Sequence, residues 1–91
     1  MYWEYVILAD DTQISYANPN EDGTLPISIE RPKDGGFDSA RCLMPSYRWS
    51  EIHGFTGAEI EGYERFLRNN APLIFEFAKQ PESERMGTLH A

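Results

Sequence analysis

"FTGAEIEGYERFLRNN", residues 55–70, decides the fold class, because the hydrophobic pattern changes its period there. Thr56, followed three residues later by Glu59, forms a capping box, which marks the start of a helix. The Glu61–Arg65 pair has the i,i+4 order that stabilises a helix and marks its solvent side. Apolar residues recur at spacings of three and four, at Ile60, Tyr63, Leu67, Ala71, Ile74 and Ala78. Such a stripe predicts a helix that packs one face on a core.

Pro72 interrupts this helical pattern. A proline removes one backbone donor and disfavours helical geometry at the residue before it. Asn69 and Asn70 are of a residue type that can end one helix and cap the next. We therefore expect two helices, at about 57–69 and 71–79, or one kinked helix. Gly62, in the middle of the pattern, favours a close approach of the sheet or of a second copy of the chain.

Before residue 46 the sequence has the composition of short β-strands, at 2–9, 12–16, 25–30 and 39–44, separated by turn-forming residues. Pro26 cannot donate to a ladder, so the third strand is expected to lie at an edge or to start late. Residues 46–54 are expected to form one short helical turn. This order predicts an α+β fold, with a small antiparallel four-stranded β-meander followed by two C-terminal helices, or one kinked helix, packed on one face of the sheet. We expect a single domain at 1–80 and a flexible C-terminal tail at 81–91.

Composition limits the classes of function. A chain of 91 residues, 41% hydrophobic and 13% aromatic, suits one small globular domain. The net charge of −7 disfavours binding to a phosphate backbone or to an anionic membrane, so we expect neither nucleic acid nor membrane as a partner. A single cysteine makes no internal disulfide, and neither a signal peptide nor an apolar stretch of spanning length is recognisable. We expect a soluble cytoplasmic protein.

The stretch "RPKDGGFDSARC", residues 31–42, invites a functional interpretation because it combines two glycines with three basic residues. It lacks the spacing of either glycine-rich phosphate-binding motif, and a strand follows it instead of a helix. The pattern therefore favours a hairpin loop whose charged residues are solvated. A weak anion site formed by Arg31, Lys33 and Arg41 is the alternative.

Cys42 has two interpretations. As a nucleophile it would need a base, and His53 with Asp38 would complete a Cys-His-Asp set if the fold brought them together. As a lone cysteine inside an apparent strand, it is more simply a small buried apolar residue. His53, His90 and Cys42 show no paired metal-ligand spacing, so we predict neither a metal nor a cofactor.

The aromatic segment "PSYRWSEIHGF", residues 45–55, is the best candidate for a recognition surface. Tyrosine, tryptophan and arginine dominate the binding energy of protein interfaces, and the segment places Tyr47, Arg48, Trp49 and His53 close together. The alternative is that its rings only bridge the sheet and the helix and cap a small core.

"GFDSARCLMPSYRW" (36–49) followed by "GFTGAEIEGYERFLRNNAPLIFEFA" (54–78) resembles a group of small bacterial proteins of unknown function. The resemblance extends from about Tyr5 to Ala78 and implies a complete protein of the bacterial cytoplasm, without implying an activity. The function we expect is a non-catalytic domain that binds another protein, as an inhibitor, antitoxin-like partner or accessory factor, or that forms a homodimer. The alternative is a small anion-binding module or cysteine-dependent enzyme centred on Arg41, Cys42 and His53.

Overall fold

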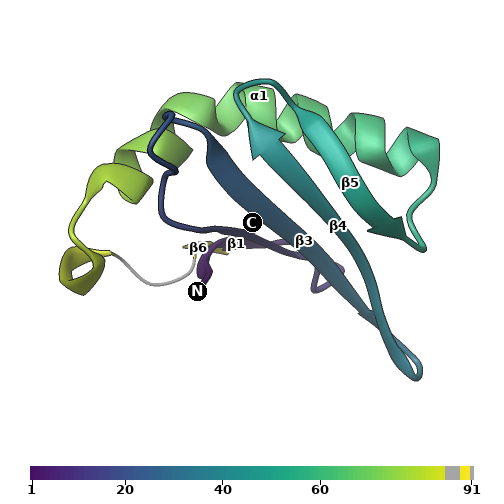
Figure 1. Ribbon diagram of the computed structural model, residues 1–91. Helices are drawn as coiled ribbons and strands as arrows, with labels where there is room; N and C mark the ends of the chain where they lie inside the picture. Colours follow the sequence, from purple (N-terminus) through teal and green to yellow (C-terminus); the bar gives the residue numbers. More distant parts are fainter. Residues whose placement is uncertain (86–88, 91) are drawn as a thin grey trace.

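A curved sheet, antiparallel over its first five strands, packs around a single long helix in the computed structural model, which describes residues 1–85 and 89–90 (Figure 1). In chain order the elements are β1 (Trp3–Ile7), β2 (Gln13–Tyr16), β3 (Leu25–Lys33), β4 (Gly36–Met44), β5 (Arg48–His53), the helix α1 (Gly57–Lys79), a short 3-10 turn η1 (Glu82–Glu84) and β6 (Leu89–His90). The strands lie in the order β5-β4-β3-β2-β1-β6, and β6 is parallel to β1. The predicted α+β class with an antiparallel meander is confirmed.

The predicted number of strands is wrong, because residues 1–85 contain five strands and not four. The segment that we expect to form a helical turn is β5, which pairs with β4 through Leu43 with Arg48 and Cys42 with Trp49. A register shift follows, and Glu51 takes a positive φ of 50°. This bulge interrupts the alternation of inward and outward side chains within a strand of six residues. The uninterrupted part is too short for the sequence pattern to indicate a strand.

The hairpin of β3 and β4 is longer than predicted. Every residue from Leu25 to Lys33 has a partner on β4, so most of the expected loop is paired strand and only Asp34 and Gly35 turn the chain. Gly35 has a φ of 81°, which side chains disfavour and glycine adopts freely. β3 is a central strand and not the predicted edge strand. Its prolines are tolerated because pairing with β2 covers only 27–30 of β3.

Of the two alternatives predicted for the helical region, the pair of helices is wrong. Within the described residues the region is the single helix α1, with Pro72 inside it, as the one-helix alternative has it. The capping box at its start is confirmed: the Thr56 hydroxyl accepts from the Glu59 amide at 3.1 Å, and the Glu59 carboxylate accepts from the Thr56 amide at 2.9 Å. Asn70 does not cap a second helix. Its amide donates to the Phe66 carbonyl at 2.8 Å and accepts from the Tyr5 hydroxyl at 2.9 Å, which ties the helix to β1.

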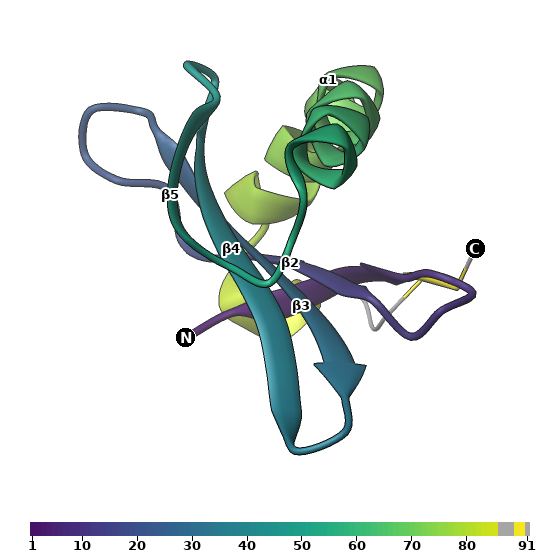
Figure 2. The ribbon, with the colours of Figure 1, turned by 90° about the vertical axis from the view of Figure 1, so that its right-hand side faces the viewer.

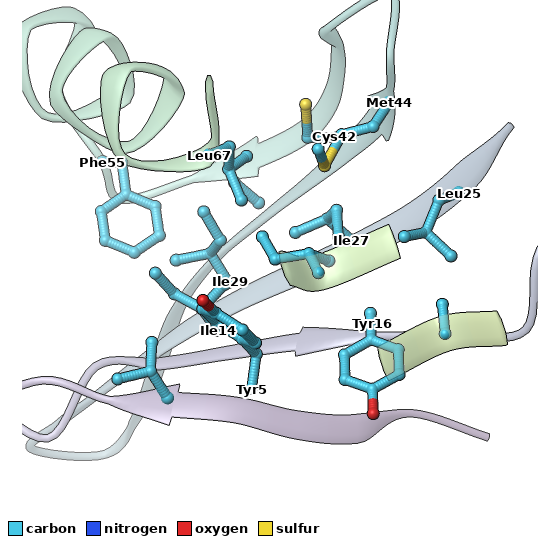
Figure 3. Packing of buried hydrophobic residues seen from close by; sticks show 14 residues of the cluster. Tyr5, Ile14, Tyr16, Leu25, Ile27, Ile29, Cys42, Met44, Phe55 and Leu67 are labelled. Atoms are coloured by element: carbon cyan, nitrogen blue, oxygen red, sulfur yellow. The ribbon is translucent and has the colours of Figure 1, made fainter. Parts of the chain in front are cut away.

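The core lies between α1 and the concave face of the sheet (Figure 2). Leu67, Ile74 and Ala78 are the buried residues of the helix, and two of them follow Pro72, so continuing the helix past the proline buries apolar surface. Figure 3 shows Leu67 of the helix facing the side chains of the sheet, among them Ile29 and Cys42. The described part of the sheet does not approach Gly62 closely: the nearest side-chain atom to an added Cβ there is in the Arg65 guanidinium, at 3.7 Å. The alternative, an approach by a second copy of the chain, stays a prediction.

Arg85 joins the segment after the helix to the domain. Its guanidinium donates to the carbonyls of Ala78 at 2.9 Å and Gln80 at 3.2 Å, and lies 4.1 Å from the centre of the Trp3 ring. A cation over the last carbonyls of a helix also interacts favourably with the helix dipole. The predicted flexible tail at 81–91 stays a prediction, and its residues 86–88 and 91 lie outside the described residues.

Candidate functional site

Two side-chain clusters connect the sheet to the helix, and between them they contain most of the residues that the sequence singles out. We call the first the Arg31 cluster: Arg31, Lys33, Asp38, Phe55 and Glu59. Arg31 and Asp38 are directly opposite each other on β3 and β4. The Arg31 guanidinium donates twice to one Asp38 oxygen, at 3.0 and 2.7 Å, and once to Glu59 at the start of α1. Lys33 lies 2.9 Å from the other Asp38 oxygen, and the Phe55 ring lies 4.7 Å below the Arg31 guanidinium.

The groups in the Arg31 cluster stabilise one another's charged forms. Hydrogen bonds from Lys33 and then Arg31 hold the pKa of Asp38 below its usual value. The hydrogen bond from Arg31, and a second from the Thr56 amide, lower the pKa of Glu59. Hydrogen bonds to Glu59 and Asp38 raise the pKa of Arg31. At neutral pH the cluster is therefore a charged structural network, and the shifts move the pKa values of Asp38, Glu59 and Arg31 away from the neutral range that suits a general acid or base.

The three residues of the proposed anion site do not come together. Arg31 and Lys33 lie on the helix side of the sheet, where their charges are neutralised by Asp38 and Glu59. Arg41 is three residues after Asp38 on the same strand, so it faces the opposite side of the sheet, where its guanidinium lies 4.9 Å from the Tyr2 ring. Because Arg31 and Lys33 are already paired with carboxylates and Arg41 lies on the other side of the sheet, the geometry gives the anion site no support.

Gly54 lets the chain pass close to the Arg31 cluster between β5 and α1. A Cβ at this position would lie 2.7 Å from the Asp38 Cγ and closer still to Oδ1, well inside van der Waals contact. Its φ is 91°, a conformation that other residues rarely adopt. Only glycine therefore fits beside the Asp38 carboxylate while Arg31 and Lys33 hold that carboxylate in place.

The second cluster, which we call the Trp49 cluster, consists of Tyr47, Trp49, Glu64 and Arg68. The Trp49 indole donates to one Glu64 oxygen at 2.9 Å, and the Arg68 guanidinium donates to the other at 3.2 and 3.1 Å. Arg68 also lies 4.1 Å from the centre of the Tyr47 ring. These hydrogen bonds, the one from Trp49 first, lower the pKa of Glu64. The two rings thus join β5 to α1, as the alternative interpretation of the aromatic segment has it.

The four residues of the predicted recognition surface are divided between two sides. Tyr47 and Trp49 are half-buried against the helix, whereas Arg48 and His53 are exposed. Arg48 is opposite Leu43, and His53 is opposite Ser39, so both lie on the side of the sheet away from α1. We call this side the open face; its residues on β4 and β5 are Phe37, Ser39, Arg41, Leu43, Arg48, Ser50 and His53.

Cys42 lies under the helix and does not meet the conditions for a nucleophile. Its exposed fraction is 3%, and burial, with a smaller contribution from the charge of Glu64, raises its pKa to about 12. His53 is on the open face, so the sheet separates it from Cys42 on the helix side. Asp38 is bound by Arg31 and Lys33. The Cys-His-Asp set is therefore not assembled, and the thiol is almost entirely protonated at neutral pH.

The described residues form no pocket, and they contain no group of three histidine, cysteine or acidic side chains placed to hold a metal ion. The helix found in residues 1–85 is not apolar enough to cross a membrane. No family model, curated protein or solved structure matches the chain. The function must therefore be argued from the surface of this molecule.

A surface residue that the sequence interpretation misses is Phe37. Its side chain is 61% exposed, more than the exposed Leu73 at 44% or Ile52 at 42%. The composition of "KDGGFDS" conceals it, because the segment resembles a polar loop. Only the pairing of Pro32 with Phe37 shows that this ring belongs to a strand and lies on the open face. If the strands of this hairpin are extended to residues 33 and 36, the alternation of side chains places Phe37 on the face away from the helix.

Proposed function

We propose that the protein is a non-catalytic domain that binds another protein through the open face of its sheet. The observation that carries the proposal is the contrast between the two faces. On the helix side, the charged groups are paired with one another and the thiol is buried. On the open face, the Phe37 ring and the side chains of Arg48 and His53 are exposed. Exposed aromatic and arginine side chains are typical of protein interfaces.

The two clusters would serve this function as supports. The Trp49 cluster holds β5 against α1 and so positions Arg48 and His53, which point away from the helix. A rigid strand that presents exposed side chains binds with a smaller loss of conformational entropy than a flexible loop does. In the bacterial cytoplasm such a domain would act as an inhibitor, an antitoxin-like partner or an accessory factor. A second copy of the chain is the alternative partner, and the charge of −7 favours protein over nucleic acid or membrane.

Quantitative affinity capture from cells that naturally produce the protein tests the proposal. The open-face variant carries Arg48→Ser with His53→Ser, and the control carries Glu61→Ser with Arg65→Ser on the exposed side of α1. We expect a stoichiometric protein partner with the wild type and the control, and its loss from the open-face variant.

The proposal fails if no protein is captured in stoichiometric amount and light scattering of the purified protein gives a monomer at all concentrations. It also fails if the partner is retained by the open-face variant and lost from the control, since the binding surface would then be the helix.

A further inference from the structure

The tip of the β3–β4 hairpin projects beyond the rest of the molecule (Figures 1 and 2). Pairing of β3 with β2 ends at Glu30, and the pairing of β4 with β5 begins at Ser39. Residues 31–38 are therefore a two-stranded extension, in which each strand pairs only with the other. We call residues 32–37 the hairpin tip.

The hairpin tip presents a single large apolar side chain on a stiff support. Phe37, 61% exposed, lies opposite Pro32, whose ring fixes its own backbone φ. On the reverse side, Arg31 and Lys33 both bind Asp38, at 2.7 and 2.9 Å, and clamp the two strands together. The strand that carries the ring is thus held in place before any partner arrives, which lowers the entropy that binding must overcome.

The surroundings of the hairpin tip are acidic. Asp34 in the turn and Glu30 at its base are exposed. The β1–β2 turn, with exposed Asp10 and Asp11, lies at the same end of the meander. Hydrogen bonds from Thr12, with a smaller contribution from the charge of Arg31, lower the pKa of Asp10. The two bases at this end, Arg31 and Lys33, are already paired with carboxylates. Any protein that receives the Phe37 ring therefore meets a negative field around it.

We propose that Phe37 is the anchor of the binding surface and that it enters an apolar pocket bordered by basic residues on a different protein. The inference rests on the proposed function and makes it more specific, since it names the central residue and the chemistry of the partner. An aromatic side chain that fills a pocket carries a large share of the binding energy of an interface, and opposite charges around it accelerate association.

Photo-crosslinking tests this proposal. A benzoylphenylalanine replaces Phe37 in one variant and Leu73 in the other, a matched control because Leu73 is an exposed apolar residue of α1. In producing cells we expect a heteromeric adduct from position 37 and none from position 73. The partner identified in the adduct is then purified and titrated. Phe37→Ser should weaken its binding at least tenfold, Leu73→Ser should change it less than twofold, and rising salt should weaken it.

The outcomes separate this inference from the proposed function. If the wild-type protein captures a partner that Phe37→Ser binds equally well, the role of Phe37 as the binding anchor is refuted and the protein-binding function stands. If the purified variant crosslinks at position 37 only to a second copy of itself, the partner class is refuted. If neither capture nor crosslinking finds a partner, both proposals fail. Phe37→Ser is expected to fold normally because the ring lies outside the core, and its thermal midpoint checks this.

Discussion

Replacing Gly54 by alanine tests whether the Arg31 cluster is as tightly packed as its geometry requires. The substitution has two costs. A φ of 91° disfavours any residue with a Cβ, by about 1–2 kcal/mol. The new Cβ also overlaps the Asp38 carboxylate, because it would lie 2.7 Å from Cγ. Overpacking of this kind typically costs about 1–3 kcal/mol. We expect Gly54→Ala to lower the free energy of unfolding by about 2–5 kcal/mol, the sum of these two ranges.

Gly23 provides the matched control for this experiment. Its φ of 85° is nearly the same, but nothing lies within 4 Å of an added Cβ. Gly23→Ala therefore measures the backbone cost alone. Urea denaturation should show Gly54→Ala to be less stable than Gly23→Ala by at least about 1 kcal/mol, and each kcal/mol corresponds to about 4–8 °C in the thermal midpoint of a domain of this size. In an Asp38→Ala background the difference between the two glycine variants should shrink. Equal costs in the wild-type background would refute the close approach to Asp38.

Three further predictions address the clusters and the thiol. Cys42 should react with a thiol reagent at least about 100-fold more slowly in the folded protein than in urea, because burial raises its pKa to about 12; equal rates would contradict its burial. Trp49→Phe keeps a ring but removes the donor to Glu64, and should cost about 0.5–1.5 kcal/mol in urea denaturation; an unchanged midpoint would show that the hydrogen bond contributes nothing. The pKa values of Asp38 and Glu59 are lower in the folded state than their ordinary 3.8 and 4.5, so the unfolded chain binds more protons at acid pH. The stability that these two carboxylates contribute is therefore lost as the pH falls below about 4.5 and through the lowered values. Thermal midpoints between pH 7 and pH 3 should show this loss, and Asp38→Asn should make it smaller; an identical pH profile for that variant would contradict the assignment.

The features that sequence predicts correctly are the local ones. The capping box of Thr56 and Glu59 lies within four residues, and the structure forms both of its hydrogen bonds. The period of the helix likewise identifies Leu67, Ile74 and Ala78 as core residues, because burial follows from the face on which each lies. Pro72 misleads because the penalty of a proline is local, whereas the burial of Ile74 and Ala78 that offsets it depends on the distant sheet.

The candidate site illustrates what local patterns omit. Arg31 contacts Glu59, which is 28 residues away, and Trp49 contacts Glu64, 15 residues away. Neither contact leaves a signal of spacing or composition, because each depends on how α1 crosses the sheet. The sequence therefore shows basic and aromatic residues of the kinds that bind ligands, and only the fold reveals that these particular ones bind one another.

Basic residues are outnumbered in this chain by fifteen acids to eight bases, and this ratio favours internal pairing. On an acidic protein, carboxylates of the same chain are present at high local concentration around each Arg or Lys. They compete with an external anion, so a basic side chain more readily joins two elements than binds a ligand. Arg31 does this between β3, β4 and α1, where its ion pairs are with Asp38 and Glu59. The same contact fixes Asp38 behind Phe37. A change at Gly54 that displaces Asp38 would therefore loosen the hairpin tip as well as destabilise the domain, which links the most constrained glycine of the fold to the residue that we propose as its binding anchor.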